Sequence, residues 1–206
     1  MESLEIENNR LIFITGGVRS GKSAFAERVA HELQDITGAT LTYIATSRRT
    51  DGEMEERINR HQKLRALSNR NWKTYEISTN FAQHIQKLDR KGIVLLDCLT
   101  VLLANELFTE NLPIEKLKKR SRQLIDQLEQ ALIELQKKTV SLIIVSNETQ
   151  YEYHGDPFVQ LYQWTLGRLH ERLVHLSTSA FLVEASIPIQ MKGDTSMLSI
   201  NSSLNE

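Results

Sequence analysis

The sequence predicts a doubly wound α/β fold, in which a mostly parallel β-sheet carries helices on both faces. Two observations support this prediction. Short apolar segments rich in β-branched residues alternate with amphipathic segments of helical length along nearly the whole chain, and such alternation is typical of α/β proteins. The short segments are also continuously apolar instead of alternating, as expected for strands that are buried on both faces of a parallel sheet.

Five short segments have the composition of buried strands, and six longer segments have the character of covering helices. The expected strands are LIFIT (11–15), LTYIA (41–45), GIVLLD (92–97), VSLIIVS (140–146) and AFLVEA (180–185). The expected helices span residues 22–34, 53–67, 79–90, 98–109, 114–137 and 158–176. Near the C-terminus, SMLSI (196–200) predicts an antiparallel edge strand before a polar end. Because no linker or repeat interrupts this order, we expect one domain over residues 1–206.

The composition is that of an ordinary cytoplasmic protein. Of the 206 residues, 40% are hydrophobic and 25% are charged, with a formal net charge of -1, which argues against a general nucleic-acid binder. Cys98 is the only cysteine, so an internal disulfide cannot form and a reducing compartment is expected. The N-terminus is polar and acidic, unlike a secretory signal, and no apolar run approaches the roughly 18 residues that span a bilayer.

The segment GGVRSGKS (16–23) matches the phosphate-binding pattern G-x-x-x-x-G-K-[ST] and lies between an expected strand and an expected helix. Glycines allow such a loop to wrap its backbone N–H groups around phosphate oxygens, and the following helix adds the positive end of its dipole. In this pattern Lys22 reaches the β- and γ-phosphates, and the Ser23 hydroxyl is a ligand of Mg²⁺. The sequence therefore predicts a P-loop NTPase-like nucleotide site. Its loop residues are Gly16, Gly17, Val18, Arg19, Ser20, Gly21, Lys22 and Ser23.

Polar residues follow two other expected strands, at the sheet edge where α/β folds place their ligands. Asp97 closes GIVLLD, where an acidic residue either holds the metal or caps the N-terminus of the next helix, two roles that are compatible. Asn147 and Glu148 follow VSLIIVS and are either ligand contacts or ordinary polar loop residues.

Six segments occur in the order typical of one enzyme family and cover most of the chain. They are TGGVRSGKSAFAE (15–27), YIATSRRTDGEMEERINRH (43–61), WKTYE (72–76), LLDCLTVLLANELF (95–108), VSNE (145–148) and GRLHERL (167–173). On these segments the sequence resembles the bifunctional adenosylcobinamide kinase/adenosylcobinamide-phosphate guanylyltransferase family of cobalamin biosynthesis, and the second segment is the most specific. In the last segment the family pattern G-R-x-N-Q reads GRLHE, with His170 and Glu171 in place of the two amides.

The resemblance implies that His61 attacks the α-phosphate of GTP and forms a covalent histidine–GMP intermediate. On the expected helix, His61 shares a face with Arg57 and Arg65, at three- or four-residue spacings. Arg60 and Lys63 extend this basic patch. Nearby cations disfavour protonation of the imidazole, which keeps a ring nitrogen free as a nucleophile near pH 7, and they also attract the triphosphate.

The same resemblance implies a wider nucleotide site. It places Thr46, Ser47 and Arg48 along the nucleotide after the second expected strand, and Glu76 against the guanine or the ribose. Further implied contacts directly follow the histidine: Gln62, Lys63, Leu64 and Arg65. Asp97 stands where the family commonly has a glutamate, and it is implied to contact the nucleotide and the metal with a shorter reach.

In function, the resemblance implies a cytoplasmic, Mg²⁺-dependent transferase that acts twice on a corrinoid. It phosphorylates adenosylcobinamide with ATP or GTP, then transfers GMP from His61 to that phosphate to give adenosylcobinamide-GDP and pyrophosphate. The resemblance also implies a homo-oligomer, commonly a trimer. Composition and hydropathy predict no nucleic-acid partner and no membrane span. Two other hypotheses stay open: a P-loop kinase of another small molecule, in which His61 only binds phosphate, and a nucleotide-binding regulatory protein without turnover.

Overall fold

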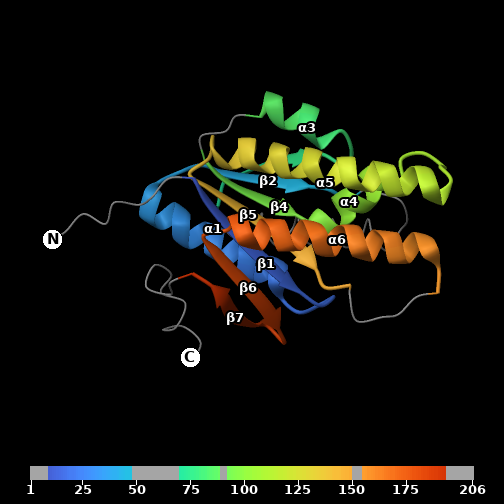
Figure 1. Cartoon of the computed structure of the whole chain (residues 1–206). Coiled ribbons are helices and arrows are strands. Elements are labelled where there is room, and N and C mark those ends of the chain that lie inside the picture. Colours follow the sequence, from blue (N-terminus) through green and yellow to red (C-terminus); the bar gives the residue numbers. More distant parts are fainter. Residues whose placement is uncertain (1–8, 48–69, 89–91, 150–154, 194–206) are drawn as a thin grey trace.

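A mostly parallel β-sheet forms the centre of the protein. The computed structural model describes residues 9–47, 70–88, 92–149 and 155–193, and within these ranges the sheet has seven strands in the order β3-β2-β4-β5-β1-β6-β7 (Figure 1). The strands are β1 (Arg10–Gly16), β2 (Leu41–Ala45), β3 (Trp72–Glu76), β4 (Ile93–Asp97), β5 (Ser141–Asn147), β6 (Ser179–Glu184) and β7 (Ile187–Lys192). All neighbouring pairs are parallel except β6–β7, which is antiparallel. The predicted fold class is confirmed.

Helices cover both faces of this sheet (Figure 1). One face carries α1 (Lys22–Thr37). The other carries α3 (Phe81–His84), α4 (Leu99–Leu107), α5 (Ile114–Gln136) and α6 (Pro157–Leu176), with a 3₁₀ turn, η1 (Ile85–Lys87), after α3.

Each face of the sheet has its own apolar core, which explains the continuously apolar strands. In β4, Ile93 and Leu95 belong to the core beneath α1, whereas Val94 and Leu96 belong to the core beneath α4, α5 and α6. All four side chains are at most 1% exposed. Burial of one such side chain contributes roughly 1.5–3 kcal/mol to the free energy of folding.

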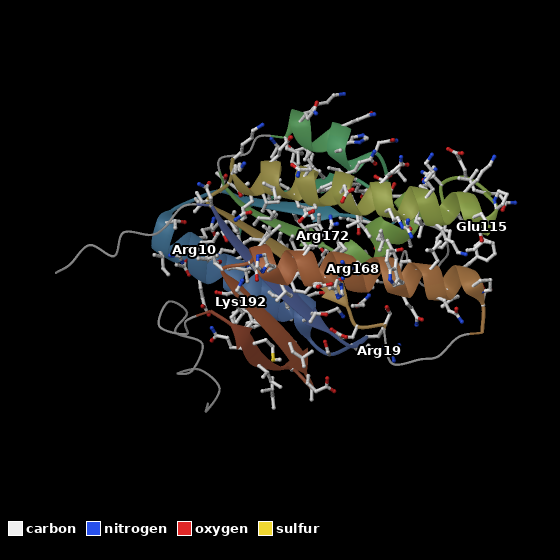
Figure 2. The ribbon with its side chains drawn as sticks, in the orientation of Figure 1. Arg10, Arg19, Glu115, Arg168, Arg172 and Lys192 are labelled. Atoms are coloured by element: carbon white, nitrogen blue, oxygen red, sulfur yellow. The ribbon has the colours of Figure 1, made fainter. Side chains whose placement is uncertain are left out.

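The helix ends follow from local sequence. α1 ends at Gly38, which adopts the left-handed conformation with φ 67°, a conformation in which glycine has no steric cost. α6 begins at Pro157, and the Asp156 side chain caps it by accepting a hydrogen bond from the backbone N–H of Phe158. On the outer surface Arg172 of α6, labelled in Figure 2, forms ion pairs with two carboxylates of α5.

Four sequence expectations need correction or lie outside the described residues. The strands β3 and β7 are not among the five expected ones, and the antiparallel edge strand is β7, whereas the expected segment 196–200 lies outside the described residues. The expected helix 79–90 is only α3 followed by η1, because the backbone at Asn80 is left-handed and the turn after His84 tightens. The expected helix 53–67 also lies outside the described residues. In the ranges that the structure covers, no helix has the length and hydropathy needed to cross a bilayer.

Candidate nucleotide-binding site

The loop between β1 and α1 has the backbone conformation of a phosphate cradle. Two of its residues are left-handed, Arg19 with φ 62° and Gly21 with φ 91°, and Arg19 lies at the outer turn of the loop (Figure 2). The backbone N–H of Ser20 donates to the carbonyl of Gly17 at 3.2 Å, which closes the first turn. Successive N–H groups in such turns form a concave surface that binds anions.

Lys22 is folded back over this loop. Its side chain is only 4% exposed, and its Nζ donates a hydrogen bond to the carbonyl oxygen of Gly17 at 2.9 Å. A buried ammonium group is costly unless it is hydrogen-bonded, so this contact keeps the positive charge at the loop. The arrangement places one fixed cation beside the backbone donors that are suited to phosphate.

The turn between β6 and β7 packs against the phosphate loop and supports it. The backbone N–H of Ser186 donates to the carbonyl of Ser20 at 2.8 Å. A Cβ atom at Gly21 would lie 2.7 Å from the Ser186 hydroxyl oxygen, and one at Gly16 would meet the carbonyl oxygen of Val183. Both glycines are therefore required by close packing against the β6–β7 turn, in addition to the left-handed conformation at Gly21.

The predicted residues Thr46 and Asp97 lie side by side where β2 and β4 end. The Tyr43 hydroxyl donates to Oδ2 of Asp97 at 2.9 Å. The fully buried Thr46 hydroxyl donates to the carbonyl of Cys98 and accepts from its N–H, both at 2.8 Å. The Asn105 side chain donates to the Thr46 carbonyl at 3.0 Å. These contacts fix the corner after β4, and Cys98, not Asp97, is the N-cap residue of α4.

Cys98 is a structural residue of this corner and not a nucleophile. Burial, followed by the charge of Asp97, raises the pKa of its thiol to about 11. The thiol therefore stays protonated near neutral pH, and the reactive thiolate does not form.

Asn147 and Glu148, at the end of β5, lie directly beside the phosphate loop. Asn147 is paired in register with Gly16, and the N–H of Glu148 donates to the Gly16 carbonyl at 3.0 Å. The Glu148 carboxylate accepts a hydrogen bond from the Thr15 hydroxyl at 2.9 Å. The amide oxygen of Asn147 is buried, with no hydrogen-bond partner among the described residues. These contacts place both residues beside the phosphate loop, and their contact with a ligand stays a prediction.

The remaining predicted residues lie in the phosphate loop itself, farther along the sheet, or outside the described ranges. Val18 is 68% exposed at the loop, whereas Ser20 is buried within it. Glu76 is exposed at the end of β3, four strands along the sheet from β1, roughly 19 Å at the usual strand spacing. Like Ser47, it lies at the edge of the sheet where the parallel strands end, but it does not lie beside the phosphate loop. Outside the described residues are Arg48, His61, Gln62, Lys63, Leu64 and Arg65.

Two of the predicted site residues, Ser23 and Asp97, have the donor chemistry for Mg²⁺. Ser23, the second residue of α1, supplies a hydroxyl, and Asp97 supplies a carboxylate of which Tyr43 engages one oxygen. No group of three or more His, Cys, Asp or Glu side chains suited to a metal occurs within the described ranges. Mg²⁺ usually takes one or two protein oxygens together with phosphate and water, so this donor set fits it.

Tyr43 and Thr15 are residues near the site that the sequence does not predict. Both lie inside apolar strand segments, where a tyrosine or threonine has no pattern that separates it from the core. Their roles depend on partners far along the chain, Asp97 and Glu148. A hydroxyl-bearing residue near the carboxyl end of a predicted strand is the only local signal that points to them.

The fold and the loop together define a P-loop nucleotide-binding α/β protein. Two solved structures are similar in fold. The flagellar accessory protein FlaH from Methanocaldococcus jannaschii has a TM-score of 0.52 and 14% identity, with coverage of 92% of this chain and 80% of that one. A solved ATPase domain has a TM-score of 0.50 and 16% identity, with coverage of 85% of this chain and 70% of that one. At these identities the similarity concerns the fold alone.

Comparison at the level of sequence shows the family. A family model described as cobinamide kinase / cobinamide phosphate guanyltransferase matches residues 12–191. The bifunctional adenosylcobalamin biosynthesis protein CobP of Pseudomonas aeruginosa is 33% identical over 186 residues, covering 88% of this chain and 96% of that protein. CobU of Salmonella typhimurium is 28% identical over 188 residues, covering 88% and 99%. The chain belongs to the cobinamide kinase/cobinamide phosphate guanyltransferase family and is an enzyme of that family. The resemblance drawn from the sequence is confirmed.

Proposed function

We propose that the protein phosphorylates adenosylcobinamide with ATP or GTP and then transfers GMP from GTP to the product. The observation that carries this proposal is the family match over residues 12–191, which includes the phosphate loop and the segment ending at His61. In the first step the hydroxyl oxygen of the aminopropanol arm attacks the γ-phosphorus, the bond to the nucleoside diphosphate breaks, and the hydroxyl proton is released to solvent. Phosphoryl transfer of this kind depends on positioning and charge neutralisation more than on covalent chemistry.

The geometry of the loop supports the kinase step. Its backbone N–H groups and the N-terminus of α1 form an anion-binding concavity. Lys22, now bonded to the Gly17 carbonyl, is placed to exchange that contact for phosphate oxygens of the bound nucleotide. Ser23 and Asp97 would hold Mg²⁺, which when bound neutralises negative charge on the phosphates.

The guanylyltransferase step rests on His61 and its basic surroundings in the sequence. An imidazole nitrogen attacks the α-phosphorus of GTP, forming a P–N bond as the bond to pyrophosphate breaks. A phosphate oxygen of adenosylcobinamide phosphate then attacks the same phosphorus, which breaks the P–N bond and gives adenosylcobinamide-GDP. Covalent catalysis of this type divides one difficult displacement into two easier ones.

Labelling with [α-³²P]GTP tests the second step. We expect acid-labile, base-stable label on the wild-type protein and none on His61→Ala, with His175→Ala as the matched histidine control. His175 lies in the last turn of α6, at its exposed end. A wild-type protein that remains unlabelled would refute the guanylyltransferase step and leave the kinase step to be judged separately.

Substrate competition tests the first step. We expect the wild type to phosphorylate adenosylcobinamide in the presence of Mg²⁺ and ATP or GTP, measured by mass spectrometry of the corrinoid. Turnover of nucleosides or nucleoside monophosphates instead would support a kinase of another small molecule. Nucleotide-induced stabilisation without any phosphorylated product would support the regulatory hypothesis.

We also infer that the enzyme forms a homo-oligomer, a trimer by family resemblance. In support, β7 presents three exposed apolar side chains on one side of an edge strand, Ile187, Ile189 and Met191, at 58%, 46% and 67% exposure. Light scattering tests this inference with Ile189→Lys, which is expected to lower the molar mass. Ile36→Lys, at an exposed apolar position of α1, is the control. A monomeric wild type would contradict the inference.

A further inference from the structure

A chain of hydrogen-bonded side chains connects α6 to the carboxyl ends of β5 and β4. Nε2 of His170 lies 2.7 Å from the Ser146 hydroxyl. That hydroxyl lies 3.0 Å from the hydroxyl of Thr100, in the first turn of α4. Ser146 is fully buried and Thr100 is 6% exposed. Buried polar networks of this kind rigidify a structure when all of their members are satisfied.

Both ends of this chain are anchored. The Thr100 hydroxyl accepts a hydrogen bond from the backbone N–H of Asn147 at 2.7 Å, and the Thr100 carbonyl accepts one from the Tyr162 hydroxyl at 2.9 Å. The His170 ring meets the ring of Phe13 edge to face, with 5.1 Å between centroids. The imidazole is therefore held by the core residue Phe13 on one side and by Ser146 on the other.

The imidazole of His170 is neutral at physiological pH. Burial lowers its pKa to about 4, so the ring carries one proton and one acceptor nitrogen. If Nε2 carries the proton, His170 donates to Ser146 and Ser146 donates to Thr100. If Nδ1 carries it, both hydroxyl bonds reverse. Since Thr100 accepts from Asn147 in either case, both tautomers keep the chain complete.

The chain ends at the strand terminus that adjoins the phosphate loop. Asn147, whose N–H is bound by Thr100, is in register with Gly16. The next residue, Glu148, donates its N–H to the Gly16 carbonyl and accepts from the Thr15 hydroxyl. A displacement of this strand end would therefore move the first residue of the loop and the carboxylate beside it.

We propose that His170 is a positioning residue that acts through Ser146 and Thr100 to hold Asn147 and Glu148 against the phosphate loop. The proposal rests on the proposed kinase function. In that reaction, a displaced loop would misplace the phosphate groups of the nucleotide and slow the chemical step. His170 itself touches neither loop nor nucleotide in this account. Position 170 requires a polar side-chain atom at the place of Nε2, because that atom must bridge from helix α6 to the buried Ser146 hydroxyl on the sheet.

Three variants test the proposal. His170→Leu removes the hydrogen bond and retains apolar bulk, and Ser146→Ala removes the same bond with a smaller change. His170→Gln places an amide group near the position of Nε2 and is the conservative rescue. His175→Leu, in the last turn of the same helix, is the matched control. The readouts are backbone amide exchange at residues 147 and 148, kcat and KM for phosphorylation of adenosylcobinamide, and the Kd for ATP.

For His170→Leu and Ser146→Ala we expect amide exchange at residues 147 and 148 about 10-fold faster, without a matching increase in the core strands. We also expect kcat to fall about 10-fold with KM for the nucleotide within about 3-fold, and His170→Gln to restore most of both losses. His175→Leu should behave as the wild type.

Unchanged amide exchange at residues 147 and 148 and unchanged kcat in both His170→Leu and Ser146→Ala would overturn the proposal. A decrease in kcat that His170→Gln does not restore, and that is proportional to the decrease in thermal stability, would also overturn it. Such a result would show that His170 contributes only to packing. If the wild type fails to phosphorylate adenosylcobinamide, the proposed function fails. Amide exchange at residues 147 and 148, together with the Kd for ATP, then still decides whether His170 positions the strand end.

Discussion

The Tyr43 hydroxyl donates a hydrogen bond to Oδ2 of Asp97 across the neighbouring strands β2 and β4, at 2.9 Å. The tyrosine is 5% exposed, so its hydroxyl orients one oxygen of the carboxylate from within the sheet. Partners of this kind fix the direction in which a carboxylate ligand presents its remaining lone pairs.

Tyr43→Phe is therefore expected to weaken the binding of Mg²⁺ by Asp97 in the kinase reaction. Loss of one hydrogen bond to a charged group corresponds to about 1.5–3 kcal/mol, and we expect the Mg²⁺ concentration at half-maximal rate to rise about 10-fold. A titration of initial rate against Mg²⁺ measures this shift. Tyr75→Phe, in the edge strand β3, is the control, and equal Mg²⁺ requirements for Tyr43→Phe and wild type would contradict the assignment of Asp97.

Gly21→Ala is expected to damage both stability and nucleotide binding. The residue is left-handed with φ 91°, and an added Cβ would lie 2.7 Å from the Ser186 hydroxyl oxygen and 3.0 Å from its Cα. We expect a loss of about 1–3 kcal/mol in the free energy of unfolding, measured by urea denaturation. Gly155→Ala, where an added Cβ meets nothing within 4 Å, should be nearly neutral. A fully stable Gly21→Ala protein would show that the loop can move away from the β6–β7 turn.

Lys22→Met is expected to weaken nucleotide binding without a comparable loss in the free energy of unfolding. Methionine keeps the apolar stem but removes the charge, so we expect affinity for ATP to fall at least about 10-fold, measured with a fluorescent nucleotide. The free energy of unfolding should fall little or rise, because a buried ammonium group no longer has to be desolvated. Lys118→Met removes an exposed lysine that pairs with Glu115 on the surface and should leave affinity unchanged. Normal affinity in Lys22→Met would remove the lysine from the proposed phosphate site.

His170 makes stability depend on pH in a defined window. Its pKa is lowered from 6.5 to about 4 in the folded protein, chiefly by burial. Above pH 6.5 both states are neutral and the group contributes nothing. As the pH falls from 6.5 toward 4, only the unfolded chain takes up the proton, so the free energy of unfolding decreases, by at most about 3 kcal/mol, before levelling off.

His170→Gln cannot take up this proton, and its stability should fall less than that of the wild type over the same interval. Urea denaturation at several pH values between 4 and 7 measures the difference between the two proteins, from which the contributions of other groups cancel. Identical pH profiles would show that the imidazole is not held neutral by burial.

The buried strands are predictable from sequence because nearly every side chain in them meets one of two cores, as the alternation of Ile93 to Leu96 shows. The edge strands are not. In β3 only Trp72 and Tyr75 are partly buried and the other three residues are exposed, so the segment has no apolar run. In β7 the apolar residues are the exposed ones, which reverses the pattern that a half-buried strand shows.

The phosphate loop is predictable for a different reason: its eight residues are contiguous, and their spacing is set by the phosphate group. The residues that orient the site are separated along the chain, by 54 positions for Tyr43 and Asp97 and by 133 for Thr15 and Glu148. No spacing along the sequence relates such pairs. They become neighbours only through the strand order, which brings β5 and β4 next to β1 and β2.

The position of β1 in the sheet has a consequence for synthesis of the protein. Its two neighbours, β5 and β6, both come from the second half of the chain, and the backbone contact that supports the loop comes from Ser186. A nascent chain that has left the ribosome only as far as β4 therefore has the glycine-rich segment but neither of the strands that border it. We therefore expect the loop to bind a nucleotide during translation only after the β6–β7 hairpin has been synthesised and has packed against the loop.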